Sequence, residues 1–143
     1  MAASRIDPVR DPVLAADNLL PALTLGPNAR REGERIVVPE GAGGHAAFGP
    51  HWPIRTGDYI ATFRIEAPAL WALRKRPVVT IEVVEGDVFF AQRAIPGRDI
   101  EAGIFDLRFR IDAPPQGRPV EFRIWSHGAV SAEIVSLAVR RAD

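Results

Sequence analysis

The sequence contains no cysteine, and that absence excludes several kinds of chemistry. A chain without thiols forms no disulfide, has no thiolate nucleophile and has no cysteine-based metal site. A surplus of charge is also lacking, because 18 basic and 18 acidic residues give a formal net charge of +0. Since nucleic acids and anionic membranes attract basic surfaces, we expect neither as the main partner.

Long hydrophobic runs are lacking as well. No apolar segment approaches the ~20 residues needed to span a bilayer, so we expect no membrane insertion. The first 13 residues contain no apolar segment typical of a signal peptide. On that basis the sequence predicts a cytoplasmic location.

Motifs of common catalytic centres are missing too. The sequence has no G-x-S-x-G, no H-E-x-x-H and no G-x-x-x-x-G-K. Its three histidines, His45, His51 and His127, each lie in or beside a glycine-containing segment, where we favour solvated loop positions over a metal site. We therefore predict that the protein is not an enzyme.

Calcium is the one cofactor that deserves consideration from the sequence. Glu40, Asp99 and Glu101 lie in predicted loops and offer carboxylate oxygens, which are the ligands that calcium prefers. No D-x-D-x-D-G loop accompanies them, so a structural calcium ion is unsupported and we expect no cofactor.

What the chain does have is alternation of apolar and polar residues, which predicts β-strands. The alternation is cleanest in residues 57–66, 103–112 and 120–125. It directs three phenylalanines into one core: Phe63, Phe109 and Phe122. Shorter segments of the same character are 34–39, 46–48, 78–85, 88–94 and 129–140.

Two interruptions of this pattern are informative. The apolar face of the last strand changes phase near Ile134–Val135, which predicts a β-bulge. Residues 67–76 have helical spacing instead, so we expect one or two helical turns there, with Trp71 as a core anchor.

About eight strands with almost no helix predict an all-β fold, an antiparallel β-sandwich of jelly-roll type with a short helical insertion. With 143 residues the chain is large enough for one hydrophobic core. We expect residues 1–25 to form an N-terminal lead and crossing segment, and residues 26–143 to form the sandwich.

An aromatic, proline-containing segment precedes the longest predicted strand. Because Pro50 and Pro53 cannot donate hydrogen bonds, we expect regular pairing to fail there. Phe48, His51 and Trp52 are then predicted to lie in a loop at the mouth of the strand that begins at Gly57.

Trp125 is the strongest candidate for ligand binding. Alternation places its side chain outside the core, on the same side as Arg123 and Glu121. An exposed indole stacks on the C–H face of a sugar ring, and an arginine donates hydrogen bonds to the hydroxyls. Packing of Trp125 over the sandwich edge has equal weight. His51 and Trp52 are further binding candidates, although we favour Trp52 as a plug at the sandwich end.

Arginines form the second candidate feature. Arg64, Arg108, Arg110 and Arg123 lie on the polar sides of predicted strands and form a basic stripe if these strands share a sheet. Cross-strand ion pairing is the commoner role of such residues. The functional alternative, which includes Arg64 in the ligand site, is recognition of a glycan with carboxylate or phosphate groups.

Three patterns carry a family resemblance. The first is G-P-H-W-x-I-x-x-G-D-Y-x-A-x-F-R, and it is followed by F-x-L-x-F-R-I and V-E-F-R-I-W-S-x-G. Together they resemble galactose-binding-like, jelly-roll carbohydrate-binding modules that accompany bacterial glycosyltransferases and other glycan-assembly proteins. The resemblance covers roughly residues 36–140, and His51 stands where such modules lead us to expect a tyrosine.

This resemblance implies a non-catalytic module that binds an oligosaccharide or polysaccharide, an acidic one included. It also implies a role in bacterial surface-polysaccharide assembly, beside a glycosyltransferase or another protein partner. The alternative from the residues alone is a structural or interaction module, whose aromatic and arginine-rich face docks a partner protein or a second copy of the chain.

Overall fold

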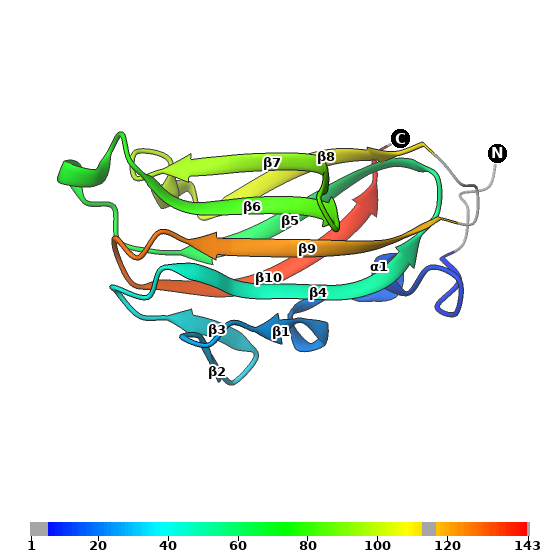
Figure 1. Ribbon diagram of the computed structural model, residues 1–143, viewed down its shortest axis with the longest axis horizontal. Helices are drawn as coiled ribbons and strands as arrows, with labels where there is room; N and C mark the ends of the chain where they lie inside the picture. Colours follow the sequence, from blue (N-terminus) through cyan, green and yellow to red (C-terminus); the bar gives the residue numbers. More distant parts are fainter. Residues whose placement is uncertain (1–5, 113–116, 143) are drawn as a thin grey trace.

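A computed structural model describes residues 6–112 and 117–142, which form two five-stranded sheets packed face to face (Figure 1). Every strand pairing within the two sheets is antiparallel. The predicted all-β antiparallel sandwich is confirmed, with ten strands instead of about eight. No helix in this part of the chain is long and apolar enough to cross a membrane.

The first sheet, sheet A, has the order β1-β4-β9-β6-β7. Its strands are β1 (Thr24–Leu25), β4 (Gly44–Ile54), β9 (Arg118–Ser126), β6 (Pro77–Glu85) and β7 (Val88–Pro96). The second, sheet B, has the order β2-β3-β10-β5-β8. Its strands are β2 (Arg30–Glu32), β3 (Arg35–Val38), β10 (Ala132–Arg141), β5 (Gly57–Glu66) and β8 (Ile104–Ile111). Short helical turns are α1 (Pro12–Ala15), η1 (Leu20–Ala22), η2 (Trp71–Leu73) and η3 (Ile100–Ala102).

The core lies between the inner faces of the two sheets. Phe63, Phe109 and Phe122 are all buried, as the alternation predicts. Phe109 of sheet B stacks on Tyr59 at 5.4 Å between ring centroids and meets Phe122 of sheet A edge-on at 6.0 Å. One aromatic cluster therefore joins both sheets.

The path of β4 differs from the expected loop. The strand runs through Pro50 and Pro53 and pairs with β9 to its end, so the prediction that the prolines prevent pairing is wrong. On its other side β4 has only the two-residue strand β1, whose pairing ends at Phe48, so the prolines lie on an open edge where no donor is required. A register shift between Pro50 and Trp52 accommodates the irregularity.

The structure confirms the predicted β-bulge, and it confirms the helical insertion but not the predicted role of Trp71. The β-bulge is confirmed, because the pairing of β10 with β5 shifts between Ile134 and Ser136. The helical insertion is present as η2, but Trp71 is 78% exposed and is not a core anchor. The turn projects from the end of the sandwich opposite the end of β10 (Figure 1), which agrees with the exposure of Trp71. The Arg74 guanidinium lies over it instead, 4.0 Å from the ring centroid.

The segment before β1 packs against the sandwich. Leu19 and Leu20 are fully buried, and the Leu19 amide donates to the carbonyl of Leu137 in β10. The Asn18 side-chain oxygen accepts hydrogen bonds from the amides of Leu20 and Leu137. Residues 18–20 therefore contribute two buried side chains to the core of the sandwich that the segment crosses.

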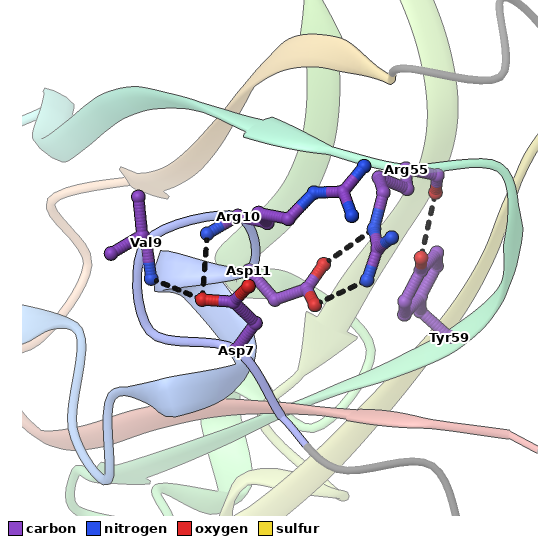
Figure 2. A network of polar contacts seen from close by, with 6 residues as sticks. All are labelled: Asp7, Val9, Arg10, Asp11, Arg55 and Tyr59. Atoms are coloured by element: carbon purple, nitrogen blue, oxygen red, sulfur yellow. Dashed lines mark hydrogen bonds and ion pairs between the residues drawn. The ribbon is translucent and has the colours of Figure 1, made fainter.

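An ion pair between the buried Asp11 and the partly exposed Arg55 attaches this segment to the connection between β4 and β5 (Figure 2). Arg55 donates from Nε and Nη2 to the two carboxylate oxygens of Asp11, at 2.9 and 2.5 Å. The hydrogen bond from Arg55 lowers the pKa of Asp11 against the opposing effect of burial. The Tyr59 hydroxyl donates to the Arg55 carbonyl at 2.6 Å, which fixes the same connection to β5.

Candidate functional site

The outer face of sheet A contains the candidate site. Strand alternation brings Trp125, Arg123 and Glu121 of β9 to this face, as predicted from the sequence. In the registers of the neighbouring strands, Trp125 lies between His45 of β4 and Thr80 of β6. In Figure 1, β4, β9, β6 and β7 lie side by side, so side chains from all four strands meet on one surface.

The face is hollowed beside Trp125. The hollow has a volume of about 210 Å³ and is lined by Thr80, Glu82, Gln92, Trp125 and His127. These residues come from β6, β7, β9 and the turn after β9. Trp125 is 38% exposed, and the His45 ring packs against its indole in a T-shaped contact with 4.6 Å between centroids.

Glu82 is the most unusual residue of the hollow. It lies on the outer face of a sheet, yet it is only 7% exposed. Gln92 Nε2 donates to Glu82 Oε2 at 2.7 Å, while Oε1 accepts no hydrogen bond from the described residues. A buried carboxylate is costly unless hydrogen-bonded, so this half-satisfied group retains capacity for a ligand donor.

A second polar pair closes the hollow. Thr80 Oγ1 and His127 Nε2 are 2.8 Å apart, and the His127 amide donates to the carbonyl of Val78. Burial lowers the pKa of His127, which favours the neutral imidazole at neutral pH. The hollow therefore combines an indole with carboxylate, amide, hydroxyl and neutral imidazole groups.

Arg123 belongs to a neighbouring cluster. Its Nε donates to Glu121 Oε1, and Nη2 donates to the Gly86 carbonyl at 3.5 Å. His51 Nε2 lies 2.7 Å from the other carboxylate oxygen of Glu121, and His51 has a positive φ of 67°. The Glu121 side chain is only 8% exposed, so its charge is compensated inside the protein.

The predicted ligand residues separate into two groups. Trp125, Arg123 and His51 share the outer face of sheet A. Trp52 is partly buried and packs against the core cluster. Arg64 is exposed on β5, which belongs to sheet B and is no neighbour of β9, so it does not extend the same surface.

The four arginines do not form one stripe, because three of them lie on sheet B and the fourth lies on sheet A. Arg64, Arg108 and Arg110 belong to sheet B, whereas Arg123 belongs to sheet A. The outer face of sheet B instead carries cross-strand contacts between exposed side chains. Arg35 lies 3.0 Å from Glu66 and 2.9 Å from Glu133.

Sequence reasoning missed Thr80, Glu82 and Gln92. In residues 78–85 the apolar Val79, Ile81 and Val83 predict the inner face of a strand, but nothing in this alternation indicates that Thr80 and Glu82 on the opposite face line a hollow. The available signal was Glu82 itself, a carboxylate inside an apolar strand. The histidines also differ from expectation: His45 and His51 lie in β4, and His45 Nδ1 is buried without a partner among the described residues.

The proposed calcium ligands stay apart from this site. Glu40 follows β3, whereas Asp99 and Glu101 lie at η3. Within residues 6–112 and 117–142 no three histidine, aspartate or glutamate side chains gather in a way that could hold a metal ion. The residues that line the hollow offer hydrogen bonding and ring stacking.

No protein-family model matches the sequence, and no curated protein matches it significantly. Its fold is similar to that in the crystal structure of accessory secretory proteins 1, 2 and 3 of Streptococcus pneumoniae, with a TM-score of 0.49 and 12% identity over 85% of this chain and 97% of that chain. It is also similar to the CBM22-1–GH10 modules of Clostridium thermocellum endo-1,4-β-D-xylanase 10B in complex with xylohexaose. There the TM-score is 0.42 and the identity 11%, over 85% of this chain and 24% of that chain. At these identities the likeness concerns the fold and assigns no ligand.

Proposed function

We propose that this protein is a non-catalytic module that binds an oligosaccharide or polysaccharide on the outer face of sheet A. The observation that carries the proposal is the hollow in which Trp125 meets the hydrogen-bonding groups of Thr80, Glu82, Gln92 and His127. A pyranose presents a C–H face that stacks on an indole and hydroxyls that donate to a carboxylate and exchange hydrogen bonds with amide and imidazole groups.

The sequence resemblance supports a setting for this activity. Modules with similar motifs accompany bacterial glycosyltransferases and glycan-assembly proteins, so we propose a role in surface-polysaccharide assembly beside such a partner. The affinity for one site is expected to be weak, on the order of micromolar to millimolar, because one stacked ring and a few solvent-exposed hydrogen bonds contribute little net free energy.

A glycan array with the purified protein tests the proposal, followed by calorimetric titration of the best binders. Trp125→Ala is expected to abolish detectable binding. Trp71→Ala is the matched control, because it removes an even more exposed indole that does not line the hollow. An array without binders, or equal loss of binding in both variants, contradicts the proposal.

A second candidate function, docking of a protein partner or of a second copy, rests on a different surface. Leu70 and Trp71 are 47% and 78% exposed beside a hollow of about 490 Å³ that also includes Arg74 and Arg98. Apolar side chains of this size on a protruding turn are typical of interaction surfaces. Sedimentation velocity of the parent and Trp71→Ser checks for self-association: a concentration-dependent dimer that disappears in the variant favours docking.

A further inference from the structure

We propose that the hollow beside Trp125 selects saccharides without anionic groups and discriminates against uronic acids and phosphorylated sugars. This inference rests on the proposed function and specifies the ligand class of the same site. It departs from the acidic glycan that the outward arginines led us to consider from the sequence.

The first argument is the charge of the groups that line the hollow. Among the described residues that line it, Glu82 is the only acidic residue, and none is lysine or arginine. His127 is largely neutral at neutral pH, because its burial disfavours the charged imidazolium. A ligand that enters the hollow therefore meets one negative charge and no fixed positive charge.

The second argument is that the nearest arginine is already engaged. Arg123 lies opposite Glu82 in the register of β9 and β6, where it could in principle neutralise that carboxylate. Its guanidinium instead donates to Glu121 and to the Gly86 carbonyl. The negative charge of the almost fully buried Glu121 offsets the positive charge of Arg123, so this arginine offers a ligand carboxylate little net positive charge.

The third argument is the free acceptor capacity of Glu82. An ionised carboxylate accepts hydrogen bonds and donates none, and Gln92 engages only Oε2. The remaining capacity suits the O–H donors of a neutral sugar. A uronate or phosphate in the same place brings acceptors toward an acceptor and a negative charge toward a negative charge that water screens poorly in a hollow.

The test compares matched sugars on the intact protein. Neutral (1→4)-linked gluco-, galacto- and manno-tetrasaccharides are titrated beside the corresponding tetrasaccharides of uronic acids, which differ by oxidation at C6. We expect the neutral member of at least one pair to bind at least about tenfold more tightly than its uronate. Since salt screens a largely buried charge only in part, the ratio is expected to shrink but not to vanish between 50 mM and 500 mM sodium chloride.

Glu82→Gln provides the decisive variant, because it removes the charge and keeps the size of the side chain. It is expected to reduce the neutral-to-uronate ratio at least about threefold, while Glu66→Gln on sheet B, which changes net charge equally, leaves the ratio unchanged. Equal or tighter binding of the uronates by the parent overturns this inference and leaves the proposed function standing. Binding of neither class overturns the proposed function and the inference together. The salt series needs no variant, so it decides the matter even if Glu82→Gln fails to fold.

Discussion

The two outer faces of the sandwich both arise from strand alternation, but their acidic side chains differ in burial. On both faces, alternation exposes polar side chains from antiparallel strands. On sheet B these side chains stay in water: the Glu66 carboxylate that pairs with Arg35 is on a side chain that is 59% exposed. On sheet A the side chain of Glu121 is 8% exposed, and Glu82 is almost as deeply buried. Polarity alone therefore does not distinguish a candidate site from a solvated surface; burial of the polar group does.

The physical reason is the cost of desolvation. An exposed ion pair such as Arg35–Glu66 contributes little to stability and loses little if broken. A carboxylate largely removed from water loses hydration that hydrogen bonds must replace, and Gln92 supplies one such bond to Glu82. The partly satisfied carboxylate of Glu82 on the outer face of sheet A can therefore accept further hydrogen bonds from ligand hydroxyls.

The largest expected effect comes from the core that both faces share. Phe109→Ala removes the ring that contacts Tyr59 and Phe122 across the two sheets and is expected to lower the free energy of unfolding by roughly 3–5 kcal/mol. Denaturant unfolding of the parent and the variant measures this loss. A loss below about 1 kcal/mol would mean that the two faces do not depend on a common core.

The next largest effect is expected on saccharide binding, and it should differ between substitutions on sheet A and on sheet B. Trp125→Ala is expected to weaken saccharide binding at least about tenfold while the melting temperature changes little, because its partly exposed ring contributes less to packing than a core ring. Arg64→Ala on sheet B is expected to leave binding unchanged. Titration and thermal melts of both variants check the contrast, which is broken if Arg64→Ala weakens binding as much as Trp125→Ala does.

A smaller effect is expected on stability at low pH. It involves Asp11, which lies on neither outer face of the sandwich. The pKa of Asp11 is lowered from 3.8 in the folded protein, chiefly by the hydrogen bond from Arg55. The stabilisation is therefore fully present above the unfolded pKa and is lost as the pH falls through the lower folded pKa. Asp11→Asn is expected to destabilise the protein at neutral pH and to flatten the decline of unfolding free energy below about pH 4. Denaturant unfolding at several pH values measures both.

Saccharide binding at neutral pH provides the control for this variant, since Asp11 and Arg55 lie at the connection between β4 and β5 and do not line the hollow. An unchanged slope of stability against pH in Asp11→Asn would show that this carboxylate does not contribute to acid sensitivity.

The smallest effect is expected on the outer face of sheet B. Arg140 donates to the Thr62 hydroxyl at 2.9 Å and lies 3.9 Å from Asp106, with 58% of its side chain exposed. Arg140→Ala is expected to cost less than about 1 kcal/mol and to leave binding unchanged. A larger loss, measured by denaturant unfolding, would show that sheet B depends on its polar network as sheet A depends on buried contacts.

Most of the strands and their inner faces could be predicted from the residues alone, although β4 could not. Alternation is a local property, because successive side chains of a strand point to opposite sides whatever the strand pairs with. For that reason the burial of Phe63, Phe109 and Phe122 and the bulge after Ile134 could be predicted from the residues. The outward direction of Trp125 followed from the same rule.

Tertiary structure alone decided which strands become neighbours. The order β9-β6-β7 brings Trp125 beside Glu82 and Gln92, although these segments are far apart in the chain and their spacing carries no signal of the contact. The division of the strands between two sheets places Arg64 and Arg123 in different sheets. The position of β4 beside the short strand β1 leaves an open edge on which its prolines are tolerated. Neighbours in a sheet are chosen by the burial of whole faces and by the paths of the connections, so residues of one strand do not reveal which side chains they will meet.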